Sequence, residues 1–169
     1  HVTVLADITN ACGAQGQANP DVAYCTSQNR IFLSQAIITT PQAQYLEAHV
    51  LGHAIQVQHG IADIALAAIR TRPTEEAYLR GLVTRQVECL AGLLYARAGF
   101  APATLSNWFS AEPFTNSHWG RDPLAIGPKV RIGLAERDAW FQRGQTASGP
   151  ADCAVGELTA APLVDAFKG

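Results

Sequence analysis

The feature that most constrains this 169-residue chain is the apolar periodicity between Pro41 and Gly99. A first helix is expected to be capped by Thr39 or Thr40, with Pro41 in its first turn and Gly60 as its stop. Its inward positions repeat at helical spacing: Leu46, Val50, His53 and Val57. The middle of the chain is therefore expected to be helical.

A third and longer helix is expected from Thr74 to Gly99, after the break at Pro73. Its apolar positions are Leu79, Leu82, Val83, Val87, Leu90 and Leu94. Shorter helices are expected at Asp63–Arg70, Ala103–Phe109 and Pro128–Arg143, the last of them ending at Gly144.

Strands are expected only near the start of the chain. "HVTVLADI" alternates and suits a strand or the remnant of a linker, and "NRIFLSQAI" has the composition of a short strand. "NACGAQGQANPDVAYC" is expected to be a loop closed by its own cysteines. The prediction is one mainly α domain (α+β) over residues 1–169, with a disulfide-closed segment 1–29 and a tail 145–169 pinned by Cys153.

Composition excludes several classes of protein. Apolar residues make up 48% and charged residues 15%, which indicates a globular chain, and no apolar run approaches a membrane span of about 20 residues. A net charge of −2 without a basic cluster argues against nucleic acid or an anionic membrane as partner. The chain begins at His1 and has no methionine, as expected of a mature chain that has lost a signal peptide or anchor.

Four cysteines permit three disulfide pairings. The most economical pairing joins neighbours, Cys12 with Cys25 and Cys89 with Cys153. In the chain-entropy model these loops would stabilise the fold by about 3 and about 4 kcal/mol. Such bridges indicate an oxidising compartment, whereas the alternative is four buried thiols in a cytosolic protein.

The stretch "EAHVLGHAIQ" places two histidines four residues apart. His49 and His53 share a helix face and could grip one zinc ion, which in a catalytic site has three protein ligands and a water. In the usual motif the residue after the first histidine is a glutamate that takes a proton from that water, but here it is Val50. The pair alone is compatible with a zinc enzyme, a former zinc enzyme or two core histidines.

Further fragments follow one another in a recognisable order. They are Cys12-Gly13, Tyr24-Cys25, "RIFLS", "HVLGHAIQ", "ECLAG" from Glu88 to Gly92, "NSHWG" around His118, "AWFQRG" from Ala139 to Gly144, and "ADC" ending at Cys153. This ordered set resembles the predicted neutral zinc metallopeptidases of bacteria, a zincin-like family whose members are usually exported or membrane-anchored. The resemblance spans nearly the whole chain, implies a zincin-like domain and supports the pairing of neighbouring cysteines.

The chain departs from the family pattern where the chemistry lies. The resemblance implies that the third zinc ligand, a glutamate in the family, is replaced by Thr84, and that Glu88 stands for the aspartate that steadies a ligand histidine. Because Val50 has also replaced the general base, we expect no peptidase activity and no firmly bound cofactor. The expected role is that of a binding or accessory protein of the cell envelope, secreted, periplasmic or on the cell surface, with a protein or peptide partner.

Two other hypotheses stay open at this point. Glu88 could turn inward and complete a zinc site with His49 and His53, giving an active zinc hydrolase. Alternatively, the domain is purely structural and its histidines belong to the core. His118 matches a family loop that helps to bind substrate or a developing oxyanion, or it is an ordinary surface histidine.

Overall fold

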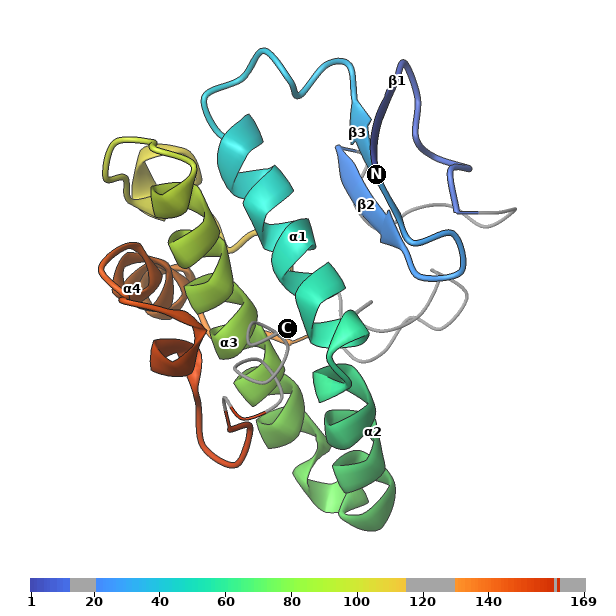
Figure 1. Cartoon of the computed structure of the whole chain (residues 1–169), viewed down its shortest axis with the longest axis vertical. Helices are drawn as coiled ribbons and strands as arrows, with labels where there is room; N and C mark the ends of the chain where they lie inside the picture. Colours follow the sequence, from blue (N-terminus) through green and yellow to red (C-terminus); the bar gives the residue numbers. More distant parts are fainter. Residues whose placement is uncertain (13–20, 115–129, 160, 162–169) are drawn as a thin grey trace.

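The computed structural model describes residues 1–12, 21–114, 130–159 and 161. Its described elements are stacked side by side (Figure 1): a small sheet, then helix α1 (Ala43–Gln58), then α3 (Glu76–Arg97), then α4 (Leu134–Gln145). Helix α2 (Ile61–Thr71) follows α1 and also packs against α3. The chain is therefore mainly helical with a little sheet, which confirms the expected α+β class.

The sheet has three described strands in the order β1 (Val2–Leu5), β3 (Arg30–Ser34), β2 (Val22–Cys25). β1 pairs with β3 in parallel, and β2 pairs with β3 antiparallel, with Tyr24 opposite Ile31. The first and third strands confirm the prediction, but β2 lies where a loop was expected. Its neighbours in the sequence are turn residues, so the strand depends on pairing with β3 rather than on its local composition.

The helices α1 and α3 are apolar on two sides because each lies between two layers. In α1, Leu46 and Val50 pack with the sheet residues Val22 and Leu33, while Gly52 faces α3. A β-carbon on Gly52 would come within 2.8 Å of Val87 Cγ2, so this glycine allows α1 and α3 to approach closely. Such two-sided burial is typical of an inner helix rather than a surface helix.

Two helix starts were predicted wrongly. Thr39 and Thr40 do not cap α1, because a turn precedes the helix and the Thr40 hydroxyl donates to Ile37 O at 2.7 Å. α4 begins at Leu134 instead of Pro128: residues 130–133 are not helical, and Gly133 has a φ of +89°, which a helix excludes. The predicted short helix at 103–109 is a single 3₁₀ turn at Leu105–Asn107.

The helices α3 and α4 cross at two glycines. A β-carbon on Gly92 of α3 would lie 2.0 Å from Phe141 O, and one on Gly144 of α4 would lie 1.9 Å from Cys89 O. Gly144 was expected to end the last helix, but it lies inside α4, which ends at Gln145. Its role is to let the two backbones touch, and the stop at the end of a helix is instead seen at Gly60, whose φ is +73°.

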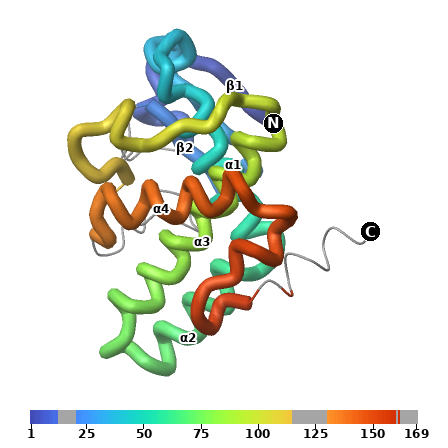
Figure 2. Tube along the Cα trace, turned by 90° about the vertical axis from the view of Figure 1, so that its left-hand side faces the viewer, coloured from blue at the N-terminus to red at the C-terminus, as the bar shows by residue number. Residues whose placement is uncertain are grey.

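The segment that follows α3 runs across the molecule between the sheet and α4, as Figure 2 shows. It carries Trp108 and Phe109 into an aromatic cluster around Tyr45 and Phe141. Leu105, at the start of this crossing, is fully buried and its N–H donates to Asp138 Oδ1 of α4 at 2.7 Å. The crossing therefore brings residues 108–114 beside α1.

Both cysteine pairs expected from the sequence are disulfides. Cys12–Cys25 joins the N-terminal segment to β2 with a Cα–Cα distance of 5.3 Å, and Cys89–Cys153 joins α3 to a 3₁₀ turn at Pro150–Cys153 with a distance of 5.4 Å. Bridges of this kind indicate an oxidising environment outside the cytoplasm. Among the described helices, none is sufficiently long and apolar to cross a membrane.

The two bridges are expected to differ in their effect on stability. Replacing Cys89 and Cys153 with alanine should lower the free energy of unfolding by about 4 kcal/mol, because that bridge closes a loop with a separation of 64 residues. The matched change at Cys12 and Cys25 removes a bridge that closes a loop with a separation of 13 residues, and should cost about 3 kcal/mol. Denaturant unfolding of both variants measures the difference, and a larger loss at Cys12–Cys25 would contradict the loop-length argument.

Candidate functional site

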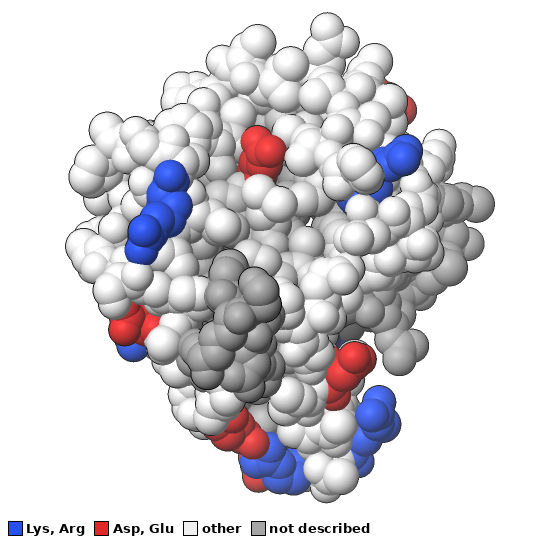
Figure 3. Space-filling view, viewed as in Figure 1, with Lys and Arg blue, Asp and Glu red and all other residues white. Residues whose placement is uncertain are grey.

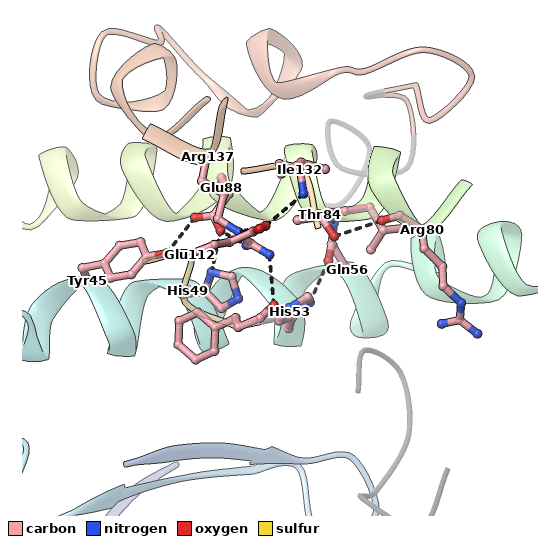
Figure 4. A network of polar contacts seen from close by, with 12 residues as sticks. Tyr45, His49, His53, Gln56, Arg80, Thr84, Glu88, Glu112, Ile132 and Arg137 are labelled. Carbon is pink, nitrogen blue, oxygen red and sulfur yellow. Dashed lines mark hydrogen bonds and ion pairs between the residues drawn. The ribbon is translucent and has the colours of Figure 1, made fainter. Parts of the chain in front are cut away.

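The two histidines of α1 lie together on the side of the helix that faces α3 (Figure 4). The ring centroids of His49 and His53 are 4.9 Å apart and their planes stand at 82°. His49 is 2% exposed, whereas His53 keeps a larger exposed fraction and is half-buried. The expected juxtaposition on one helix face is thus present.

Glu88 of α3 lies directly behind His49. The distance from His49 Nδ1 to Glu88 Oε1 is 3.4 Å, which is ion-pair range, although the alignment is too poor for a hydrogen bond. This is the contact that the resemblance implied for a residue that steadies a ligand histidine. Glu88 itself is fully buried, so its charge needs compensation from the protein.

That compensation comes from two further side chains. Tyr45 donates its hydroxyl hydrogen to Glu88 Oε2 at 3.0 Å, and Arg137 Nη1 donates to Glu88 Oε1. Burial alone would raise the pKa of Glu88, but the neighbouring His49 and Arg137 lower it to about 2. Burial and the adjacent Glu88 raise the pKa of Tyr45, so its hydroxyl remains a donor. Glu88 is therefore an ionised carboxylate held on both of its oxygens.

Arg137 of α4 connects Glu88 to the segment that crosses in front of the histidines. It is 1% exposed, donates through Nε to Glu112 Oε1 at 2.8 Å, and donates through Nη2 to Phe114 O at 2.9 Å. Glu112 Oε1 also accepts the N–H of Ile132 at 2.9 Å. One guanidinium thus stands between two carboxylates, and it fixes the position of residues 112–114.

Phe114 covers the first histidine. Its ring stacks on His49 with centroids 4.0 Å apart and planes within 8° of parallel. Its backbone has a φ of +55°, which is uncommon for a bulky residue and shows that the surroundings hold it there. The face of the His49 ring is consequently packed against carbon rather than open to solvent.

Gln56 fixes the tautomer of His53. The Gln56 amide nitrogen donates to Val83 O at 3.0 Å and to Gln86 Oε1 at 3.1 Å, so its oxygen is the atom that meets His53 Nδ1 at 3.0 Å. Because that oxygen can only accept, Nδ1 of His53 carries the hydrogen and Nε2 keeps a lone pair. Desolvation, reinforced by His49, lowers the pKa of His53 to about 3, so the ring is neutral at physiological pH.

Val50 and Thr84, which the resemblance places at the positions of the base and the third ligand, are engaged elsewhere. Val50 is 6% exposed and belongs to the apolar cluster between α1 and the sheet. The Thr84 hydroxyl donates to Arg80 O of its own helix at 3.0 Å, and Thr84 is also buried. Neither side chain can accept a proton from a bound water as a carboxylate would.

These donors do not fit a catalytic zinc ion with three protein ligands. Two imidazole nitrogens are available, but Glu88 is bound by Arg137 and Tyr45, and Thr84 is neutral. In the described part of the chain, no three or more His, Cys, Asp or Glu side chains are grouped to hold a metal ion. His118 lies outside the described residues, so its placement stays a prediction.

Phe114, whose ring stacks on His49, also lines an open pocket of about 380 Å³. We refer to it as the aromatic pocket, and the described residues that line it are Asp21, Ile37, Gln42, Leu46 and residues 108–114. Trp108, Phe109 and Phe114 supply its aromatic surface, and Asp21 and Glu112 supply carboxylates. None of these residues is predicted as a site residue by the sequence motifs.

Sequence reasoning also missed Arg137, Tyr45, Glu112 and Phe114. A fully buried glutamate at position 88 requires a cation, but several arginines in the chain could have supplied it. The resemblance to neutral zinc metallopeptidases rests on the ordered motifs alone, because comparisons with family models, curated proteins and solved structures gave no match.

Proposed function

We propose that this chain is a zinc-metallopeptidase-like domain without peptidase activity, which binds a protein or peptide partner in the cell envelope. The observation that carries the proposal is the state of the one carboxylate beside His49 among the described residues. Glu88 is buried and held by Arg137 and Tyr45, so it can serve neither as a proton acceptor nor as a metal ligand without losing those partners. The residue at the usual base position is the packed Val50.

The active zinc hydrolase is the weaker hypothesis for the same reason. Turning Glu88 toward the histidines would leave Arg137, 1% exposed, with one carboxylate partner fewer. General acid–base groups typically contribute 10²–10⁴-fold to such reactions, and neither Val50 nor Thr84 can supply one. The lack of a carboxylate at position 50 and the lack of one at position 84 both disfavour peptide hydrolysis.

A binding role suits the surroundings of the histidines. The aromatic pocket is concave, partly apolar and has a few polar groups, which is typical of ligand sites. The two disulfides favour a secreted, periplasmic or cell-surface location, where such a domain would meet its partner. The partner class proposed is a peptide segment of an envelope protein.

A purely structural domain is the second candidate, and one observation favours it. His49 is 2% exposed and stacks on Phe114, as a core residue would. The two candidates differ in binding, since a structural domain has no peptide ligand. Crosslinking the purified protein to a peptide library derived from envelope proteins, followed by mass spectrometry, tests this, and crosslinks at residues 108–114 are expected only for the binding domain.

The absence of peptidase activity is tested directly. The purified protein, supplied with zinc and freed of contaminating proteases, is incubated with a mixed peptide library with and without a chelator. We expect no cleavage that the chelator abolishes. Chelator-sensitive cleavage that disappears in a His49→Ala, His53→Ala variant would refute the proposal.

Restoring the two missing carboxylates should restore metal binding. The double change Val50→Glu, Thr84→Glu is expected to raise zinc affinity at least tenfold, because it adds a third ligand opposite His49 and His53. The readout is zinc titration by calorimetry, together with a zinc-dependent rise in melting temperature. Val50→Gln, Thr84→Gln is the matched control without charge, and equal zinc affinity in the two variants would show that these positions do not converge on the histidines.

A further inference from the structure

The strand β1 leaves one edge of the sheet open. It pairs with β3 on one side, and in the part of the chain that the structure describes no strand lies on its other side, which faces away from α1 (Figure 1). The other outer strand, β2, is covered, because Val22, Ala23 and Cys25 are buried. In β1, by contrast, Val2 and Val4 are each 46% exposed. β1 is therefore the uncovered edge of the described sheet.

The backbone of Val2 and Val4 points outward at this edge. The carbonyls of His1 and Leu5 accept backbone N–H groups of β3 and of the residue after it, at 2.9 and 2.7 Å. Because backbone groups alternate in direction along a strand, those of Thr3 also face β3. The N–H and C=O groups of Val2 and Val4 then point away from β3, and the described residues supply no strand to pair with them.

The side chains of Val2 and Val4 extend the apolar face of the sheet past its helix. Val2 is in register with Ile31 and Val4 with Leu33, so these side chains point to the same face of the sheet. Ile31 and Leu33 pack in one cluster with Leu46 of α1 and are buried, whereas the two valines stay half exposed. They form an apolar strip along the open edge.

Most of the usual protections of a sheet edge are missing from β1. Natural edges often carry lysine, proline or inward-pointing charges that prevent pairing with another strand. Residues 2–6 include no charged residue and no proline. The surface seen in Figure 3 carries few charged side chains near the sheet, and more of them at the opposite end of the molecule, around α2. The short length of four residues is the protection that β1 keeps.

We infer that β1 pairs with β1 of a second copy of this chain, antiparallel about a two-fold axis at Thr3. In this register Val2 lies opposite Val4 of the second copy, and each such pair exchanges both of its N–H···O=C bonds. The two Thr3 residues meet at the axis, and the three-stranded sheets of the two copies join into one. The inference does not depend on the proposed function, since β1 does not line the aromatic pocket.

Symmetry and charge favour a second copy over an unrelated strand. The outward groups of Val2 and Val4 are placed equally about Thr3, so the same strand satisfies all of them in one register and sets valine beside valine on one face. Two copies of an uncharged strand also place no like charges opposite each other. A standard interface has about 20–30 residues on each side, against the four of β1, so the dimer is expected to dissociate on dilution.

Sedimentation velocity of the full chain tests the association. We expect the sedimentation coefficient to rise from the monomer value toward the dimer value as the protein concentration approaches about 1 mM. Val4→Pro removes the outward N–H and leaves the bonds of residues 1, 3 and 5 to β3, so it should weaken the dimer about tenfold with little change in melting temperature. Val4→Ile is the matched control that keeps the N–H and the apolar side chain, and it should associate like the native chain.

Paired charges test the register. Val2→Lys with Val4→Lys should abolish the dimer by repulsion, whereas Val2→Lys with Val4→Glu should restore it, because position 2 lies opposite position 4 of the second copy. Ile64→Lys is the control, since Ile64 is 48% exposed on α2 and far from β1 in the fold. A chain that stays monomeric throughout, a dimer that Val4→Pro leaves unchanged, or equal association of the two charged variants would overturn the inference.

Discussion

Replacing Arg137 with methionine is expected to lower the free energy of unfolding by about 3–5 kcal/mol, because it leaves a buried carboxylate without its cation. Glu88 is fully buried, and His49 at 3.4 Å and the hydroxyl of Tyr45 are the described partners that remain. Methionine fills a similar volume, so the loss reports charge more than packing. Denaturant unfolding at pH 7 measures it.

The pH dependence separates this explanation from a simple packing defect. In the native chain the pKa of Glu88 is about 2, below its ordinary value of 4.5, so its stabilisation is present above about pH 4.5 and is lost as pH falls toward 2. Without Arg137, the pKa of Glu88 should be higher than in the native chain, because one of the two groups that lower it is lost while burial remains, so protonation at low pH relieves the variant. The difference in stability between the two proteins is expected to shrink from pH 7 to pH 3.

A surface arginine provides the control. Arg143→Met on the same helix removes an exposed guanidinium that lies 4.7 Å from the centre of the Trp140 ring, and should change stability by less than about 1 kcal/mol. An Arg137→Met loss that is equal at pH 7 and pH 3 would contradict the electrostatic account of Glu88.

Gly144→Ala is expected to destabilise the protein by about 3 kcal/mol or more. The added β-carbon would lie 1.9 Å from Cys89 O, a backbone atom that cannot move without shifting α3 against α4. Alanine normally stabilises a helix by about 1 kcal/mol relative to glycine, so a loss here must come from the contact between helices. Thermal or denaturant unfolding gives the change.

Gly81 is the matched control because it also lies within a helix and is buried. A β-carbon there would meet the flexible end of the Arg85 side chain, which can turn aside. Gly81→Ala should therefore be neutral or stabilising by up to about 1 kcal/mol. If Gly144→Ala behaves in the same way, the close crossing of α3 and α4 is not as described.

The sequence predicted the elements whose signal is local. Apolar spacing gave α1, α2 and α3 within a few residues, since each helix buries its own repeated positions over several turns. Periodicity missed β2, because Val22–Cys25 becomes a strand only through β3. It also misjudged Gly144, because glycine ends helices more often than it allows two helices to touch. Residues whose role is set by a distant partner left no local signal.

In the candidate site, too, residues placed by local helix geometry could be predicted, and residues placed by distant contacts could not. His49 and His53 share a face by helix geometry, and Glu88 was placed near them through the resemblance. Arg137 and Phe114 reach these residues from other parts of the chain, and nothing in their own neighbourhoods indicates those contacts. Periodicity can identify a buried face, but it cannot say which of several arginines neutralises a buried glutamate.

Glu88 and Arg137 lie far apart in the sequence, and this separation affects the order in which the helices can pack during folding. During synthesis from the N-terminus, α1 and α3 are complete well before Arg137 emerges, since Glu88 precedes its cation by 49 residues. Until then, docking α3 onto α1 would bury an ionised carboxylate with Tyr45 and His49 alone. The inner helix pair is therefore expected to close late, when the last helix arrives, and chains truncated before α4 should remain loosely assembled and prone to aggregation.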